Sequence, residues 1–213
     1  MVRTMVQSSD PPSPGIRLAI APDALVVLVG AAGSGKSTLA ARLFPADAIL
    51  SSDALRAALS GDPANQAATR LAFRILHEQA ARRLAAGQLT VVDATNVEAS
   101  ARRPLRRLAQ AAGRPVVAIV LDLPPATCLA RNAARTERIV PAAAVLRQLA
   151  ALRRSLDRDE LAAEGYDQLI VVADPGWLDS ATIGETKPGG AATLGRSTLG
   201  PSALPRRSRR SKP

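Results

Sequence analysis

Cysteine, aromatic side chains and long apolar runs are all scarce in this sequence, and each scarcity argues against a class of protein. The single cysteine, Cys128, rules out a disulfide framework and a cysteine-based metal site, and it fits a reducing cytoplasm. The longest apolar run is far shorter than the roughly 20 residues that a membrane span needs. The first residues lead into Ser-, Asp- and Pro-containing sequence instead of an apolar signal core. We therefore expect a cytoplasmic protein with no membrane partner.

Aromatic residues are limited to two Phe, one Trp and one Tyr. Proteins that bind single strands by stacking present aromatic side chains to successive bases, so we do not expect such a platform here. Apolar residues still make up 47% of the 213-residue chain. That is enough for a core, and the length allows one α/β domain with tails.

The net charge of +10 lies mostly at the C-terminus. Residues 185–213 hold seven basic residues and one acidic residue, so the rest of the chain is only mildly basic. Residues 176–213 are rich in Gly, Pro, Ser and Thr without apolar periodicity, which predicts a disordered, low-complexity basic tail. Such a tail is usually solvated, and non-specific binding to anionic polymers is a second use for it.

What the sequence does contain is a phosphate-binding motif. The pattern G-x-x-x-x-G-K-[ST] stands between an apolar strand pattern at 24–29 and an amphipathic helical pattern. Its glycines allow consecutive backbone N–H groups to face one anion, and the positive end of the helix dipole strengthens the site. The predicted ATP-binding residues are Gly30, Ala31, Ala32, Gly33, Ser34, Gly35, Lys36, Ser37 and Thr38.

Two side chains of this motif have further expected roles. Lys36 is expected to reach the β- and γ-phosphates, and the Ser37 hydroxyl is expected to bind Mg²⁺. The alternative is a glycine-rich turn that binds nothing. Because every motif position is filled in the right context, we expect a nucleoside triphosphate-binding protein that uses ATP and Mg²⁺.

Strand and helix patterns alternate along the chain. Strands are expected at 24–29, 48–51, 89–93, 115–121 and 168–173, and helices at 36–44, 54–59, 64–86, 99–112 and 126–134 with a basic helical region to about 163. This alternation without tight hairpins predicts an α/β fold, with a mostly parallel five-stranded sheet and helices on both faces.

Polar residues follow several of these strands, at the edge of a parallel sheet where ligands bind. Asp53 is a candidate base for an acceptor alcohol. Arg56, one helical turn further on, could bind an acceptor phosphate through two hydrogen bonds. The alternative is a helix N-cap at Asp53 and a surface charge at Arg56, because Asp is a preferred capping residue. Spacing alone does not decide between these alternatives.

Asp93 ends the third predicted strand, and we expect it to bind Mg²⁺ directly or through water. Asn96, just beyond it, could contact phosphate or merely close the turn. His77 and Cys128 lie in helical patterns and are expected to be packing residues.

Three arginines follow the fourth predicted strand at spacings of four and three residues. This spacing places Arg131, Arg135 and Arg138 on one helix face. They could form a lid over ATP that supplies positive charge to the transferring group. A solvated basic face is the alternative.

Taken together, four segments resemble the kinase module of bacterial polynucleotide kinase-phosphatases, a family of P-loop 5′-hydroxyl polynucleotide kinases. They are the P-loop at 30–38, Ser-Ser-Asp-Ala-Leu-Arg at 51–56, Leu-Thr-Val-Val-Asp-Ala-Thr-Asn at 89–96 and Arg-Asn-Ala-Ala-Arg at 131–135. The resemblance runs from about residue 24 to about residue 172. The expected P-loop kinase domain is 23–175, with a lid at about 126–145. Residues 1–22, which contain Pro-Pro-Ser-Pro-Gly at 11–15, are expected to be a flexible lead-in, with a short edge strand at 16–20 as an option.

The resemblance implies ATP-dependent phosphorylation of the 5′-hydroxyl end of DNA or RNA, a step of nucleic-acid end repair. By this resemblance Asp53 is the general base, Arg56 holds the acceptor phosphate with Asn96 nearby, and the lid arginines are Arg131 and Arg135. The catalytic set is then Lys36, Asp53, Arg131 and Arg135.

Two other functions remain open: a kinase for a small alcohol or nucleoside, and an ATP-binding module without enzymatic activity. The family's phosphatase and ligase modules are not found in this sequence, so a separate phosphatase or ligase is an expected partner. A polynucleotide would be held by arginine contacts to its backbone, and its binding should weaken steeply with salt.

Overall fold

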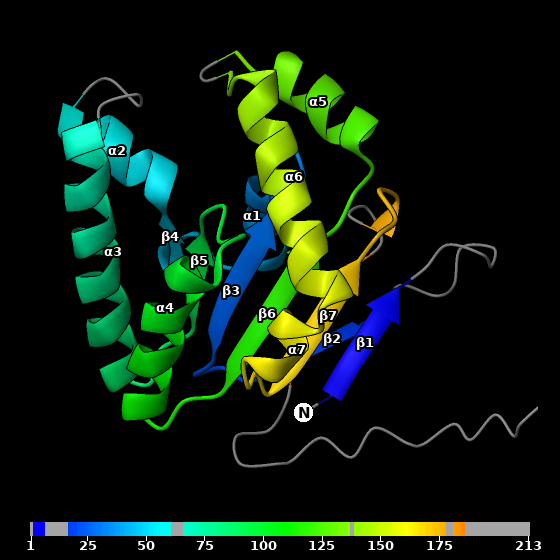
Figure 1. Ribbon diagram of the computed structural model, residues 1–213. Coiled ribbons are helices and arrows are strands. Elements are labelled where there is room, and N and C mark those ends of the chain that lie inside the picture. The colour runs from blue at the N-terminus through cyan, green and yellow to red at the C-terminus, as the bar shows by residue number, and fades with distance from the viewer. Residues whose placement is uncertain (1, 7–16, 61–65, 137–138, 178–180, 186–213) are drawn as a thin grey trace, which may run out of the picture.

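A computed structural model describes residues 2–6, 17–60, 66–136, 139–177 and 181–185, and it is built on a six-stranded parallel sheet (Figure 1). The strand order is β1–β7–β6–β3–β5–β4, and every neighbouring pair is parallel. The strands are β1 (Val2–Val6), β3 (Leu25–Gly30), β4 (Ile49–Ser51), β5 (Thr90–Asp93), β6 (Val116–Leu121) and β7 (Gln168–Val172). The five strands that the sequence predicts are all present, and β1 extends the sheet at one edge.

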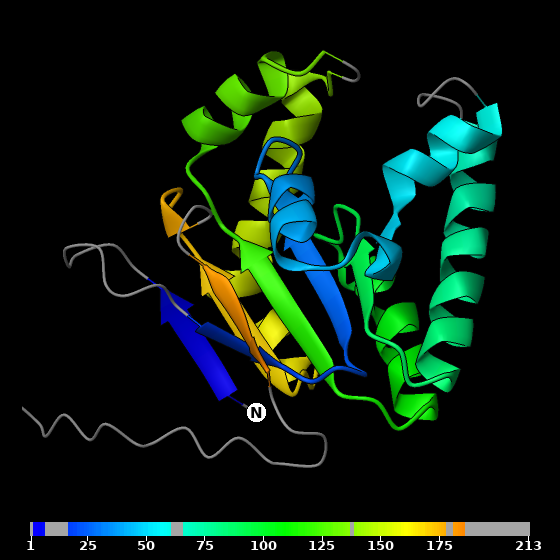
Figure 2. The same ribbon diagram turned by 180° about the vertical axis from the view of Figure 1, so that it is seen from behind.

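Helices cover both faces of this sheet, as predicted (Figure 1 and Figure 2). One face carries α3 (Gln66–Ala85), α4 (Ala99–Ala111), α6 (Ala142–Asp157) and α7 (Glu160–Ala163). The other face carries α1 (Lys36–Leu43). The remaining helical elements are the 3-10 turn η1 (Ala46–Ala48), α2 (Ser52–Ser60) and α5 (Pro125–Ala133), of which α2 and α5 lie at the carboxyl end of the sheet.

Alternating side chains of the central strand β3 fill two separate cores. Val26 and Leu28 belong to the core beneath α1, whereas Val27 and Val29 belong to the core beneath α3, α4 and α6. All four are fully buried, as expected for a parallel strand that is covered on both faces. This packing fixes β3 from two sides and therefore holds the loop that follows it.

Segments near both termini are part of the folded unit, which corrects the predicted boundaries at residues 22 and 175. Within the predicted flexible lead-in, β1 pairs with β7, and β2 (Arg17–Ile20) pairs with β8 (Thr182–Glu185). Trp177, inside the predicted tail, is buried in the core beneath α1. β2 corresponds to the short edge strand that the sequence suggests at 16–20. β1 and β8 are not predicted, because they are short and their partners come from the other end of the chain. The rest of the predicted disordered tail, 186–213, lies outside the described residues.

None of the helices in the described ranges is both long and apolar enough to cross a membrane.

Candidate active site

The P-loop leaves the carboxyl end of β3 and turns into α1 through two glycines in the left-handed region. Gly33 has a φ of 80° and Gly35 a φ of 93°, a conformation that a Cβ atom disfavours. Gly35 is the N-cap of α1, and within the described structure no side chain caps that helix. The first N–H groups of α1 are therefore available to an anion, as the motif predicts.

Gly33 is also the point where the P-loop meets α5. A Cβ atom at position 33 would overlap the backbone carbonyl oxygen of Cys128. Cys128 is fully buried, and burial raises the pKa of its thiol, so the thiol stays neutral and acts as a packing group. The close approach of the two backbones ties the P-loop to α5, the helix that carries Arg131 and precedes Arg135.

Replacing Gly33 by Ala is expected to lower the free energy of unfolding by about 1–3 kcal/mol, because the added methyl group overlaps α5 and strains the backbone. Thermal unfolding measures this as a lower Tm. Gly113→Ala is the matched control: Gly113 has a φ of 64°, but nothing lies within 4 Å of its added Cβ. The Gly113→Ala variant therefore reports the cost of backbone strain alone. Equal losses of unfolding free energy in the two variants would contradict a steric overlap between position 33 and α5.

The Lys36 ammonium group is folded back onto the P-loop. Its Nζ donates hydrogen bonds to the carbonyl oxygens of Gly30 (2.9 Å) and Ala31 (2.8 Å). Lys36 is 8% exposed. Burial lowers its pKa to about 8, although the negative charge of nearby Asp93 opposes this shift. The ammonium therefore sits beside the phosphate-binding N–H groups with a pKa close to neutral pH.

The ATP affinity of the nucleotide-free protein should fall as the pH rises through about 8, because ATP binding needs the charged form of Lys36. Bound phosphates favour that charged form, so ATP binding above this pH takes up a proton. Titration calorimetry near pH 8.5, in buffers of different protonation enthalpy, measures the uptake. In Lys36→Arg the guanidinium stays charged, and the uptake should disappear. An uptake of the same size in that variant would contradict the assignment to Lys36.

Lys36 lies in the wall of a cleft of about 130 Å³ at the carboxyl end of the sheet. The register places Ser51 of β4 beside Asp93 of β5, which brings the start of α2 to the end of β5. The cleft contains seven of the predicted site residues: Ala32, Lys36, Ser37, Asp53, Arg56, Asp93 and Arg135. It is completed by Ser52, Ala94, Thr95, Val140 and Gln148.

Asp93 and Ser37 are the oxygen donors that fit Mg²⁺ in this cleft. Asp93 is 7% exposed and lies close enough to Lys36 to affect its pKa, while Ser37 stands in the first turn of α1. The described residues contain no group of three or more His, Cys, Asp and Glu side chains that could hold a metal. Mg²⁺ does not need one, because it usually binds one or two carboxylates together with substrate phosphates and water.

Asp53 and Arg56 form an ion pair in the wall of the cleft. Helix α2 begins at Ser52, earlier than predicted, and its Ala54 N–H donates to Oγ of Ser51 at 3.3 Å. Ser51, and not Asp53, therefore caps this helix. The Arg56 side chain is 11% exposed, so Arg56 is not a solvated surface charge. Both residues line the cleft, with the Asp53 side chain 55% exposed, and their roles as base and phosphate contact stay predictions.

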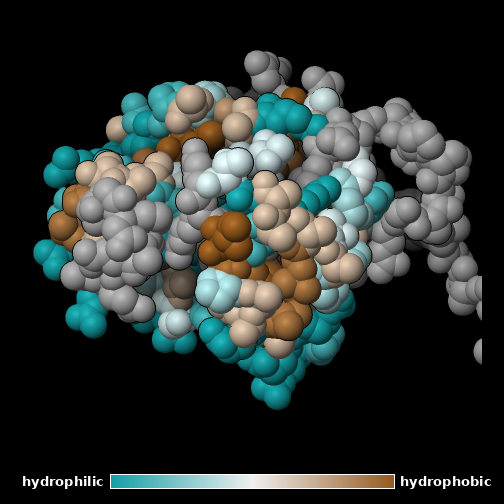
Figure 3. Space-filling view, turned by 90° about the horizontal axis from the view of Figure 1, so that it is seen from above, coloured by the Kyte–Doolittle hydropathy of each residue, from teal (hydrophilic) through white to brown (hydrophobic). Residues whose placement is uncertain are grey.

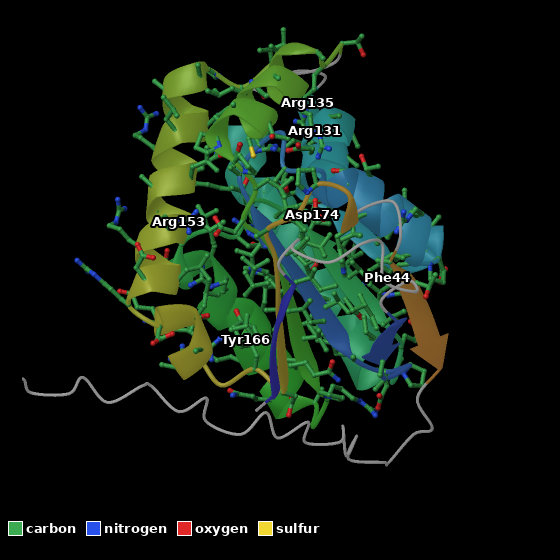
Figure 4. All side chains as sticks on the ribbon, turned by 90° about the vertical axis from the view of Figure 1, so that its right-hand side faces the viewer. Phe44, Arg131, Arg135, Arg153, Tyr166 and Asp174 are labelled. Carbon is green, nitrogen blue, oxygen red and sulfur yellow. The ribbon has the colours of Figure 1, made fainter. Side chains whose placement is uncertain are left out.

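The lid arginines lie close together at the carboxyl end of the sheet, where Figure 4 labels them. Arg135, which follows α5, lines the cleft and lowers the pKa of Lys36 through its charge. Arg131 is exposed and is not part of the cleft wall. Arg138 lies outside the described residues. A contact with ATP therefore has a structural basis for Arg135 and stays a prediction for Arg131.

Asn96 is buried and secures the loop that follows β5. Its Nδ2 donates to the carbonyl oxygen of Leu28 at 2.9 Å, and its φ is 48°. Of the two predicted alternatives, this geometry favours closure of the turn over contact with a phosphate. Arg102 of α4 secures the same loop, because its Nη1 donates to the carbonyl oxygens of Asn96 (2.9 Å) and Val97 (2.7 Å).

Gln148 of α6 is a site residue that the sequence patterns do not reveal. Its Oε1 accepts a hydrogen bond of 2.9 Å from the N–H of Ala32 in the P-loop. A glutamine within an amphipathic helix belongs to no motif, and only the tertiary fold brings it to the loop. A phosphate that binds the Ala32 N–H competes with this hydrogen bond, so nucleotide binding is linked to the position of α6.

The fold and the cleft define a P-loop protein of the kinase type, with a parallel sheet, a phosphate-binding loop and a carboxylate at the end of the neighbouring strand. The profile of the AAA domain family, AAA_33, matches residues 25–158, and the chain belongs to this family. A search of curated proteins finds no relative at the sequence level.

Solved structures show the same fold. A chain of the Pnkp1/Rnl/Hen1 RNA repair complex is similar over 66% of this chain, at 18% identity and a TM-score of 0.57. This chain spans 47% of that chain's length. A chain of the AvrRxo1-ORF1:AvrRxo1-ORF2 structure with sulphate ions is similar over 72% of this chain and 55% of that one, at 18% identity and a TM-score of 0.54. At these identities the similarity shows the fold alone.

Proposed function

We propose that this protein transfers the γ-phosphate of ATP to the 5′-hydroxyl end of a polynucleotide. The observation that carries the proposal is the Asp53–Arg56 pair in the wall of the P-loop cleft. A carboxylate there can take the proton of an alcohol, and a guanidinium beside it can bind a phosphate through two hydrogen bonds. A polynucleotide end brings both groups, a hydroxyl and a nearby phosphodiester. The resemblance of four sequence segments to 5′-hydroxyl polynucleotide kinases supports the same acceptor.

In this proposal the acceptor phosphate replaces Asp53 as the partner of Arg56. The Asp53 carboxylate then accepts the proton of the 5′-hydroxyl while the hydroxyl oxygen attacks the γ-phosphorus. The bond from that phosphorus to the bridging oxygen breaks, and ADP leaves. Lys36 exchanges its loop carbonyls for β- and γ-phosphate oxygens, and Arg135 adds positive charge from the lid side.

Ser37 and Asp93 would hold Mg²⁺ in this cleft, and a bound Mg²⁺ neutralises charge on the nucleotide phosphates. Their placement on α1 and at the end of β5 supports this assignment.

A small alcohol or nucleoside is the second candidate acceptor. The small volume of the cleft, about 130 Å³, favours it, and the fold serves both acceptor classes. A neutral small alcohol would bring no phosphate to Arg56, however, and would leave Asp53 paired with it.

The test is transfer of labelled γ-phosphate from ATP with Mg²⁺ to three kinds of acceptor. They are DNA and RNA oligonucleotides with a 5′-hydroxyl, the same oligonucleotides with a 5′-phosphate, and small alcohols that include a nucleoside. Label on the 5′-hydroxyl oligonucleotides alone is expected, at a rate that falls steeply with salt. Label on a small alcohol and on no oligonucleotide overturns the proposal, and a flat salt response counts against a polymer.

We also propose a separate phosphatase or ligase as a partner, because a kinase adds only one of the groups that a broken strand needs. The resemblance of four sequence segments to the kinase module of polynucleotide kinase-phosphatases supports this proposal.

A further inference from the structure

A second cavity of about 450 Å³ adjoins the P-loop cleft. Four residues line both spaces: Ser52, Arg56, Thr95 and Gln148. The cavity lies between α2 and α3 on one side and α6 on the other, with the start of α4 at its base. Seen from above, the surface is hollowed between these two parts of the molecule (Figure 3). Its volume lies in the range of pockets that hold a small organic ligand, about 300–1,000 Å³, whereas the P-loop cleft is far smaller.

Part of the lining of this cavity is apolar and includes an aromatic ring. The apolar lining residues are Phe73 of α3, Val97, Ala101 of α4 and Ala144 of α6. Phe73 is half-buried, and His77, one turn further along α3, supports its ring at a centroid distance of 6.4 Å. The only other Phe of the chain, Phe44, is buried in the core beneath α1, away from both spaces (Figure 4). A half-buried ring that faces a cavity can stack on a planar group of a ligand.

The rest of the lining is charged and polar. Arg147 of α6 is exposed and lines this cavity one residue before Gln148, while Arg56 reaches it from the side shared with the P-loop cleft. Glu98 is the single acidic residue among the lining groups, so the lining is net positive once an acceptor phosphate replaces Asp53 as the partner of Arg56. This charge favours an anion that lies next to the planar group of the ligand.

We propose that this second cavity binds the 5′-terminal nucleoside of the acceptor strand, with its base on Phe73 and its 3′-phosphate between Arg56 and Arg147. The proposal rests on the proposed kinase function. In this proposal the residues that line both spaces connect the nucleoside site to the P-loop cleft. A nucleoside in the larger cavity then extends its 5′-hydroxyl past Arg56 toward Asp53. It also revises the expectation drawn from the few aromatic residues: the site needs one ring for one base and no extended stacking platform.

The test compares two oligonucleotide acceptors that differ only in the base of the 5′-terminal nucleotide, which is either present or absent. For the wild-type protein, removal of that base is expected to lower kcat/KM by roughly 5- to 150-fold, the usual range for loss of one stacked base. In Phe73→Leu the two acceptors should react equally, at the lower rate, with the KM for ATP unchanged. Phe73→Tyr keeps the ring and should keep the discrimination.

Arg147→Ala tests the phosphate contact. It is expected to raise the KM for both acceptors and to reduce the slope of log kcat/KM against log salt by about 1. Arg154→Ala is the matched control, because Arg154 is an exposed arginine two turns further along α6 and outside both cavities. Equal effects of the two substitutions would overturn the contact with Arg147.

Failure of this inference differs from failure of the proposed function. If wild type labels both acceptors equally well, or if Phe73→Leu keeps the discrimination, the nucleoside does not bind on Phe73 although the kinase activity stands. If wild type labels neither oligonucleotide, the proposed function is wrong and this inference is wrong with it.

Discussion

Replacing Asp53 by Asn is expected to lower kcat for transfer to a 5′-hydroxyl by about 10²–10⁴-fold, the usual contribution of a general base. The amide keeps the shape of the side chain but cannot accept the proton of the alcohol. The dissociation constant of ATP should change by less than about twofold, because Asp53 stands on α2, across the cleft from the P-loop. Steady-state rates and ATP titrations on the same variant measure the two quantities separately.

Asp47→Asn is the matched control for this substitution. Asp47 lies in η1, its side chain is 80% exposed, and it pairs with Arg83 at 3.6 Å, outside the cleft. It should behave as wild type. Retained function in Asp53→Asn, together with loss of ATP binding in Lys36→Ala, would show an ATP-binding module instead of a kinase.

Replacing Arg102 by Met is expected to lower the free energy of unfolding by about 3–5 kcal/mol, the range for breaking a buried ion pair from one side. Arg102 is completely buried, and its Nε donates to Oε2 of Glu164 at 3.0 Å. The substitution leaves Glu164 without its main partner and removes the donor to the carbonyl oxygens of Asn96 and Val97. Urea unfolding at neutral pH measures the loss.

Arg106→Met is the comparison for Arg102→Met. Arg106 lies on the same helix as Arg102, and its side chain also reaches the Glu164 carboxylate. The Arg106 side chain is 15% exposed and its Nε lies 3.5 Å from Oε2 of Glu164. It makes a weaker contact, so the expected loss is about 1 kcal/mol. Losses of equal size for the two variants, or a loss below about 1 kcal/mol for Arg102→Met, would contradict the role of Arg102 in holding the loop.

The sequence predicts those parts of the site that depend on local chemistry. The P-loop needs glycines at fixed positions and a lysine at the start of a helix, and the structure has Gly33, Gly35 and Lys36 in that arrangement. Asp93 follows from its position at the end of an apolar strand. In a parallel sheet these strand ends must meet at one edge, so the common cleft could be expected before the structure was known.

What the sequence does not predict depends on contacts between distant segments. Phe73, Gln148 and Arg102 look like ordinary residues of amphipathic helices, and only the packing of α3, α6 and α4 brings them to the site. The same limit applies to the domain boundaries. Trp177 lies in a stretch rich in Gly and Pro, yet it is buried in the core beneath α1. Beyond it, β8 pairs with β2 from the other end of the chain.

The most direct test of the kinase assignment is the position of the label after transfer from γ-labelled ATP to a 5′-hydroxyl oligonucleotide. Complete digestion of the product to nucleotides should place all label in the 5′-terminal nucleotide as a 5′-monophosphate, and Asp53→Asn should slow its appearance by about 10²–10⁴-fold. Label released only as inorganic phosphate, or found on an internal nucleotide, would contradict transfer to the 5′ end.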